Sequence, residues 1–232
     1  MDKMIGVLGG MGSLASETFY KMVIEMTEVD CDQDYPNMVI FNDAAMPDRT
    51  KAILANDYDE VADKILNDLE KLKVCGCEAV GITCNTAHFF VDLLETKLPV
   101  KVIHMVNETV NKIAEEFPGS KVAILATDGT IKTGLYQKHM EASGLEPFVP
   151  DENLQKKVMY EIYDCVKAAK PVDKKVWSEI DKAIKDAGCT SAILGCTELS
   201  VIKEQNSLSD EYIDPMRVLA EKLIVYSGKR LR

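Results

Sequence analysis

Residues 76–86 read GCEAVGITCNT and residues 188–198 read GCTSAILGCTE, so the chain carries one pattern twice. The two stretches align without a gap at an offset of 112 positions (188 minus 76), and two cysteines fall in register. Each is a short apolar run that ends in a cysteine and a polar turn, which is typical of a buried strand leading into a helix. Two buried strands can resemble each other by chance, but eleven aligned positions favour a duplication.

A second pair of stretches repeats in the same order. Residues 7–12 (VLGGMG) match residues 124–129 (ILATDG) at an offset of 117 positions (124 minus 7). The chain therefore divides into two similar halves of about 110 residues, and each half opens on a short apolar strand.

Short apolar runs alternate with longer segments of helical period along the chain. This alternation predicts an α/β fold with mainly parallel sheets. We expect strands at residues 5–8, 39–41, 79–83, 100–104, 122–126, near 148 and at 192–195. We expect helices from about residue 13, over residues 58–72, through residues 90–94, over residues 106–117, after the turn at residues 128–129, and over residues 152–168, 174–187 and 215–226. The last four residues, 229–232, are expected to form a solvated tail.

Composition excludes several classes of function. The chain has 232 residues, of which 47% are hydrophobic and 28% are charged, so it can bury a large core. Its 27 basic and 38 acidic residues give a net charge of −11, which disfavours nucleic acid as a partner. No apolar run approaches the roughly 20 residues that cross a bilayer, so no membrane is expected. Residues 1–8 (MDKMIGVL) lack the basic start and the cleavage site of a signal peptide, and we therefore expect a cytoplasmic protein.

The seven cysteines need separate explanations. An odd number cannot all pair in disulfides, which favours a reducing compartment. Cys75 and Cys77 are separated by one residue and have no matching Cys or His pair downstream, so we expect no metal. Cys84 and Cys196 differ from the other five, because each stands at the end of an expected strand where a helix begins.

Cys84 and Cys196 are therefore candidates for catalysis. A helix N-terminus lowers the pKa of a thiol, and parallel sheets place their ligand clefts at these strand ends. Buried free cysteines are more often plain hydrophobic residues, but two equivalent ones across one cleft favour function. A thiolate and a thiol on opposite faces of a carbon can remove a proton and return one, which is the chemistry of a racemase or epimerase.

Four stretches resemble the motifs of the cofactor-independent aspartate/glutamate racemase family, in particular its aspartate racemase branch. They are, in chain order, MIGVLGGMG at residues 4–12, PDRT at 47–50, TCNTAH at 83–88 and LGCTEL at 194–199. The resemblance implies two pseudo-symmetric three-layer α/β domains with mainly parallel sheets and the active site in the cleft between them. We expect residues 1–104 with 215–232 to form the first domain and residues 105–214 the second.

The resemblance also implies an activity. The protein would interconvert L- and D-aspartate without pyridoxal phosphate, as a homodimer that binds a small amino acid. Cys84 and Cys196 would be its two acid–base residues. Arg49 would bind a substrate carboxylate, which a guanidinium can hold with two hydrogen bonds. The other substrate-binding residues implied by the resemblance are Met11, Asn85, Thr86, Thr127, Lys167 and Thr197.

Three residues depart from the pattern of the family. Ala169 stands where we expect a glycine, close to Lys167. Ser13 and Ser16 stand where proline and threonine are usual, and a serine can still cap a helix. The serines lie near Met11, so they bear on the shape of the pocket and on the preferred substrate.

Other interpretations stay open at this point. The chain could be a glutamate or broad-specificity racemase, an isomerase or decarboxylase of related acids, or a catalytically silent protein that binds a small acid. Residues 9–12 (GGMG) do not complete the G-x-G-x-x-G turn of dinucleotide-binding proteins, so no nucleotide cofactor is predicted. His88 is either a proton shuttle or a packing residue, and Glu198 either orients Cys196 or caps its helix.

Overall fold

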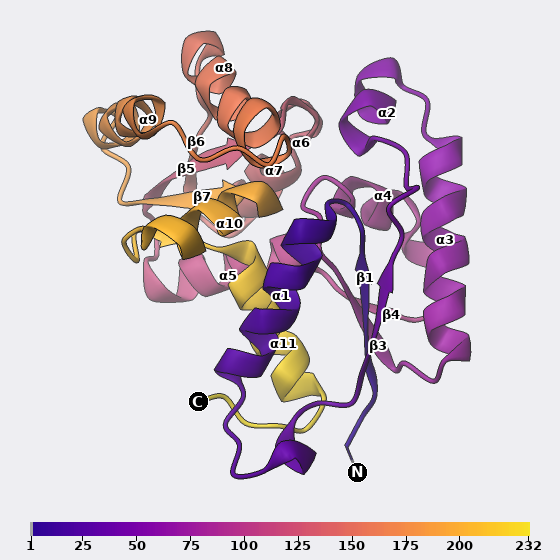
Figure 1. Ribbon diagram of the computed structural model, residues 1–232. Coiled ribbons are helices and arrows are strands. Elements are labelled where there is room, and N and C mark those ends of the chain that lie inside the picture. The colour runs from indigo at the N-terminus through magenta and orange to yellow at the C-terminus, as the bar shows by residue number, and fades with distance from the viewer. Residues whose placement is uncertain (1) are drawn as a thin grey trace.

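The computed structural model describes residues 2–232, which fold into two α/β halves lying side by side (Figure 1). The strands are β1 (Ile5–Gly9), β2 (Met38–Asn42), β3 (Ala79–Ile82), β4 (Lys101–Ile103), β5 (Lys121–Ala126), β6 (Glu146–Phe148), β7 (Ser191–Gly195) and β8 (Tyr212–Ile213). The α-helices are α1 (Ser13–Met26), α2 (Arg49–Ala55), α3 (Asp59–Val74), α4 (His88–Leu93), α5 (Met105–Glu116), α6 (Asp128–Thr133), α7 (Leu135–Ala142), α8 (Glu152–Tyr160), α9 (Lys174–Asp186), α10 (Thr197–Asn206) and α11 (Pro215–Tyr226). Two short 3₁₀ helices, η1 (Asp32–Asp34) and η2 (Glu95–Lys97), and one π-helix, η3 (Glu161–Val166), complete the set. None of the helices in this described range is long and apolar enough to cross a membrane.

The strands form two parallel sheets with the same topology. The order in the first sheet is β2-β1-β3-β4, and the order in the second is β6-β5-β7-β8. Each strand of one sheet therefore has a counterpart at the same position in the other, which is what a duplicated chain should give. The α/β class and the parallel sheets are confirmed, and all seven expected strands are present. Strand β8 and helix α2 were not expected.

Helices cover both faces of each sheet, so each half is three layers deep. In the first half, Leu8 packs toward α3 and α4, whereas Val7 packs toward α1 and α11 on the opposite face. Successive residues of a strand point to opposite faces, which is why these neighbours enter different cores. In the second half, Leu194 packs toward α8, α9 and α10, and Ile193 packs toward α5 and α7. In Figure 1, α3 lies on the outer flank, whereas α1 and α11 lie near the middle of the molecule.

Helix α11 returns to the first sheet although it follows the second sheet in sequence. It packs on β3 and lies along α1 and α5 (Figure 1). Gly81 makes the approach to β3 possible, because a Cβ at this position would lie 2.6 Å from Leu223 Cδ1. On this packing we propose that residues 1–104 with 215–232 form the first domain and that residues 105–214 form the second.

The turn that carries Met11 is held by a serine, but not by the helix cap expected from the sequence. The N-cap residue of α1 is Gly12, and no side chain caps the helix. The Ser16 hydroxyl instead accepts the backbone N–H of Gly10 at 2.9 Å and donates to the carbonyl of Gly12 at 3.0 Å. Neither serine caps α1, but the helix forms as expected, and Ser16 fixes the turn from inside the helix.

The C-terminal residues are bonded to the end of α1 rather than left in solvent. The backbone N–H of Arg232 donates to the Met26 carbonyl, and the backbone N–H of Glu28 donates to the Arg230 carbonyl, both at 2.9 Å. Leu231 forms an antiparallel bridge with Thr27. The prediction of a solvated tail is therefore wrong for the backbone, although the side chains of Arg230 and Arg232 are exposed.

We predict that Gly81→Ala lowers the free energy of unfolding by about 1–3 kcal/mol, because the new methyl group overpacks the contact between β3 and α11. Urea unfolding of the two proteins measures the difference. Leu223→Ala in the same background makes room for the methyl group, so the double variant should lose less than the sum of the two single losses. Strictly additive losses would show that the two side chains do not meet.

Candidate active site

The carboxyl ends of β1, β3, β5 and β7 border one cavity between the two domains. Parallel strands end at the same edge of their sheet, so the residues that follow them gather there. All nine site residues predicted from the sequence line this cavity. Asp48, Thr50, Tyr163 and Glu198 line it too, although the sequence did not indicate them as substrate ligands.

The cavity is almost closed. Its volume, counted as the space open to the centre of a water molecule, is about 20 Å³, which is room for about one ordered water. Cys84 and Cys196 are each 6% exposed, and Met11 is 2% exposed. Little water remains to screen the charges inside, so their interactions are strong.

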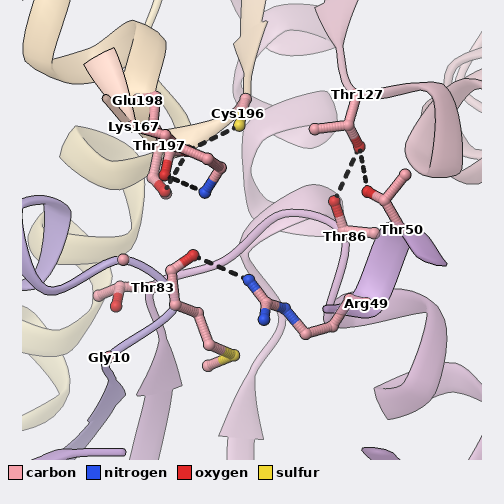
Figure 2. Close-up of polar contacts among 12 residues, drawn as sticks. Gly10, Arg49, Thr50, Thr83, Thr86, Thr127, Lys167, Cys196, Thr197 and Glu198 are labelled. Carbon is pink, nitrogen blue, oxygen red and sulfur yellow. Dashed lines mark hydrogen bonds and ion pairs between the residues drawn. The ribbon is translucent and has the colours of Figure 1, made fainter. Parts of the chain in front are cut away.

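Cys196 is the N-cap residue of α10 and lies in a chain of polar contacts. Its thiol donates to Glu198 Oε2 at 2.8 Å, and Glu198 Oε1 is ion-paired with Lys167 (Figure 2). Thr197 Oγ1 lies 3.5 Å from the same carboxylate. Burial and the charge of Glu198 raise the pKa of the Cys196 thiol well above its usual value, although Lys167 opposes this shift. Cys196 therefore keeps its proton in this arrangement.

Lys167 enters the cavity from the end of the π-helix η3. Burial alone would lower its pKa, but the negative charge of Glu198 and the hydrogen bond to it raise the pKa of Lys167 above its usual value, so Lys167 is a cation. Its Nζ lies 5.6 Å from the centre of the Tyr163 ring. Ala169, two residues further on, has a φ of +55°, in the left-handed region that favours glycine. A glycine adopts this conformation without steric strain, which explains why a glycine is expected at this position.

Cys84 lies in the turn after β3, with Arg49 beside it. Burial tends to lower the pKa of Arg49, but the charge of Cys84 raises it. The guanidinium donates to the carbonyls of Pro47 at 2.8 Å and of Met11 at 3.0 Å, which fixes its position. Arg49 Nε is buried and has no hydrogen-bond partner among the described residues. This N–H is therefore available to a carboxylate in the cavity.

Asn85 follows Cys84 and is held by the second domain. The Tyr136 hydroxyl on α7 donates to Asn85 Oδ1. Burial raises the pKa of Tyr136 well above its usual value, as does the charge of Asp214, so the hydroxyl stays a donor. Asn85 Nδ2 is buried and unpaired within residues 2–232, which leaves a second donor beside the first cysteine.

Four threonine hydroxyls join the two domains at the cavity. Thr127 Oγ1 lies 3.2 Å from Thr50 Oγ1 and 3.0 Å from Thr86 Oγ1, as Figure 2 shows. Thr130 Oγ1 lies 2.9 Å from Thr86 Oγ1 and 3.2 Å from Thr127 Oγ1. Thr50 and Thr86 come from the first domain and the other two from the second, so this cluster fixes how closely the domains approach.

His88 is a packing residue rather than a proton shuttle. The backbone N–H of Met105 donates to His88 Nε2 at 3.1 Å, so the proton is on Nδ1, which donates to the Cys84 carbonyl at 2.9 Å. The ring is fully buried, and burial together with the charge of His104 lowers the pKa of His88 to about 3. His88 thus ties the turn that carries Cys84 to the start of α5 and stays neutral.

The described part of the chain has no group of three or more His, Cys, Asp or Glu residues that could hold a metal ion. The polar groups of the cavity are instead arranged as two cysteines, two cations and a set of hydrogen-bond donors from both domains.

The comparisons with known proteins agree with this geometry. Residues 8–223 match the family model described as Asp/Glu/hydantoin racemase. The chain belongs to this family. The resemblance seen in the four sequence motifs is therefore confirmed, and membership makes the protein a racemase, which is an isomerase, acting on a small amino acid.

Three racemase relatives cover nearly all of the chain. The broad specificity amino-acid racemase RacX of Bacillus subtilis (strain 168) is 27% identical over 227 residues, which are 95% of this chain and 96% of RacX. The structure of Picrophilus torridus aspartate racemase has a TM-score of 0.83 at 27% identity and covers 99% of this chain and 96% of its own. An aspartate racemase homologue from Pyrococcus horikoshii OT3 has a TM-score of 0.77 at 25% identity, over 98% of this chain and 100% of its own.

Sequence signals existed for some of the racemase cavity residues that were not predicted as ligands. Asp48 and Thr50 flank Arg49 in the PDRT stretch, and Asp48 is the N-cap residue of α2. Tyr163 stands four residues before Lys167, a spacing that puts both on one side of a helix. The carboxylate of Glu198 contacts Cys196, which confirms that Glu198 orients this cysteine.

We predict that His88→Asn changes both the stability and its pH dependence. The folded pKa of about 3 lies below the ordinary value of 6.5, so the contribution of His88 is complete above pH 6.5 and is lost as the pH falls toward 3. One such group gives a slope of about 1.4 kcal/mol per pH unit. Between about pH 6 and 4, which is roughly the window between the two pKa values, the free energy of unfolding of the variant should therefore fall less steeply with decreasing pH than that of the wild type. At neutral pH it should be less stable by about 1–3 kcal/mol, because two buried backbone groups lose their partner.

Urea unfolding of wild type and variant at several pH values measures both effects. Equal slopes in the two proteins would contradict a buried, neutral His88.

Proposed function

We propose that this racemase interconverts L- and D-aspartate without a cofactor, by moving the α-proton between Cys84 and Cys196. One cysteine removes the proton from one face of the α-carbon, and the other returns a proton to the opposite face. The observation that carries the proposal is that two cysteines at equivalent positions of a duplicated fold line one closed cavity.

The neighbours of the two cysteines support a thiolate and a thiol as the starting pair. Cys84 has the Arg49 guanidinium beside it, a cation that can pair with the sulfur when Cys84 acts as the base. Cys196 donates a hydrogen bond to Glu198 and is held as a thiol. In this state Cys84 is the base and Cys196 the acid, and one turnover exchanges the two roles. The pair titrates as a unit, so its pKa values belong to both cysteines together.

The cations of the cavity support a substrate with carboxylates. The α-proton of an amino acid is a very weak acid, so the site must stabilise the negative charge that develops when it leaves. Arg49 offers a free Nε, and Lys167 is a buried cation. The net charge of −11 does not prevent capture of an acidic substrate, because salt screens distant charges over about 8 Å. The likeness to Picrophilus torridus aspartate racemase favours aspartate.

A broad-specificity racemase is the second candidate, and one contact favours it. Lys167 is already paired with Glu198, so Arg49 is the cation that is ready to take a carboxylate. A single carboxylate is common to all amino acids, and RacX of Bacillus subtilis is a relative with broad specificity. Racemisation assays with aspartate, glutamate and neutral amino acids, each without added pyridoxal phosphate, separate the two candidates and also detect a silent binding protein.

The proposal also includes the setting expected from the sequence. The enzyme would act in the cytoplasm as a homodimer, in a compartment that keeps its seven cysteines reduced. Size-exclusion chromatography with light scattering measures the oligomeric state directly.

We predict that Cys84→Ala and Cys196→Ala each reduce racemisation by at least about 10²–10⁴-fold, because each removes one of two acid–base groups. Chiral chromatography of the product measures this loss. Each variant should still exchange the α-proton of one enantiomer with solvent, since one thiol remains on one face. Cys189→Ala is the control. Cys189 is the repeat counterpart of Cys77 and lies outside the cavity, so this variant should keep full activity. Normal turnover by either cavity variant would contradict the two-thiol mechanism.

We predict that Arg49→Ala raises KM for aspartate by about tenfold or more, since a buried charged hydrogen bond contributes about 1.5–3 kcal/mol. Steady-state kinetics give KM and kcat separately, and thermal unfolding checks that the loop around Met11 and Pro47 has kept its fold. Arg217→Ala, at an exposed position on α11, is the matched control. An unchanged KM would mean that Arg49 does not bind the substrate.

A further inference from the structure

The cavity leaves no room for the substrate in the state described here. Its 20 Å³ accept about one water molecule, and any amino acid is several times larger. Some group that fills the cavity must therefore move when the substrate binds.

Glu198 brings a carboxylate of the chain itself into the cavity. Its side chain is 5% exposed, and its Oε1 is ion-paired with Lys167 inside the cavity (Figure 2). An ammonium has three N–H donors, but a second carboxylate at Lys167 would lie close to the carboxylate of Glu198, and two like charges in one buried site repel each other. Any ligand that brings a carboxylate to Lys167 has to compete with Glu198.

The duplicated fold makes this carboxylate a distinctive feature of the second half. At the offset of 112 positions, Glu198 corresponds to Thr86, whose hydroxyl bonds to Thr127 and Thr130 and carries no charge. The first cysteine turn therefore has a neutral group where the second has an anion. Of the two cysteine turns, only the one after β7 carries a carboxylate that can compete with a ligand for a cation.

The backbone around Lys167 is suited to such an exchange. Lys167 directly follows the π-helix η3 and precedes Ala169, which holds a left-handed conformation at some cost in energy. Its side chain is 26% exposed, whereas that of Glu198 is 5% exposed. Lys167 is thus the partner that can move toward an incoming carboxylate, while Glu198 stays bonded to Cys196.

We propose that Glu198 is a specificity-determining residue, an internal carboxylate that competes with the second carboxylate of an acidic ligand for Lys167. This inference rests on the proposed function of the cavity as an amino acid site. A ligand with one carboxylate binds to Arg49 and leaves the pair of Lys167 and Glu198 intact. A ligand with two carboxylates must displace Glu198, so Glu198 weakens the preference of the site for acidic ligands.

The test compares the binding of succinate, which has two carboxylates, with that of butyrate, which has one. Neither can be racemised, so binding is measured apart from catalysis, by isothermal titration calorimetry. In Glu198→Gln, which keeps the shape and removes the charge, the Kd of succinate should fall at least tenfold. The Kd of butyrate should change less than threefold. Glu179→Gln is the matched control, because Glu179 is also paired with a lysine, at 2.9 Å from Lys157, but lies outside the cavity.

The double variant Lys167→Met/Glu198→Gln shows whether the effect passes through Lys167. In this background the gain in succinate binding should disappear. Equal changes for the two ligands in Glu198→Gln, or a gain that persists without Lys167, would overturn the proposal. Thermal unfolding checks that the variants fold, and Glu198→Met, of similar length and without charge, replaces the glutamine variant if that one is unfolded.

Racemisation by the wild-type protein distinguishes a failure of the proposed function from a failure of the role of Glu198. If aspartate is racemised and Glu198→Gln leaves the ratio of succinate to butyrate binding unchanged, the proposed function stands and the role of Glu198 is wrong. If no amino acid is racemised and the ratio rises as expected, the competition for Lys167 stands and the proposed function is wrong.

Discussion

The carboxyl ends of parallel strands lie at one edge of a sheet, and in this chain two such edges border the same cavity. Everything else about the site depends on this constraint. The turns after β3 and β7 carry Cys84 and Cys196, and equal strand order in the two sheets makes them counterparts. Helix α11 packs against both α1 and α5 and contacts strands of both sheets, so it connects the two halves. The threonine cluster then fixes how closely the domains approach at the cavity itself.

The duplication supplies two equal thiols, and the surrounding charges make them unequal. Arg49 stands beside Cys84, whereas Glu198 accepts a hydrogen bond from the thiol of Cys196. A racemase working by two bases needs one deprotonated and one protonated group at the start of each turnover. In the closed cavity these charges act with little screening, so a small number of side chains can set which thiol holds the proton. Lys167 balances the charge of Glu198, which in turn contacts the thiol of Cys196.

Much of the fold and of the site could be predicted from local sequence. The apolar runs gave the strands because each is short, bounded by turn residues and followed by a helical pattern. The repeat around Cys84 and Cys196 then placed both cysteines at strand ends, which determines where they lie in a parallel sheet. Strand β8 was missed because two residues are too few for a pattern, and α2 was missed although Asp48 is a good N-cap residue.

The remaining features depend on long-range contacts that no local pattern contains. The contact between Glu198 and Lys167 joins residues 31 positions apart, and it arises only because η3 brings Lys167 over the start of α10. The orientation of the two domains decides that Thr86 meets Thr127 and Thr130. At Ala169, by contrast, the sequence alone pointed to a structural feature. This residue departs from the family pattern, and its backbone is left-handed.

The most direct test of the two-thiol account follows the first turnovers of the wild-type protein with L-aspartate in deuterated water. Proton NMR reports the α-proton of each enantiomer after chiral separation, with reducing agent present and no added pyridoxal phosphate. The account predicts that D-aspartate appears with deuterium at the α-carbon while the remaining L-aspartate still carries its proton, because separate groups act on the two faces. D-aspartate that keeps the original proton, or exchange into L-aspartate without inversion, would contradict it.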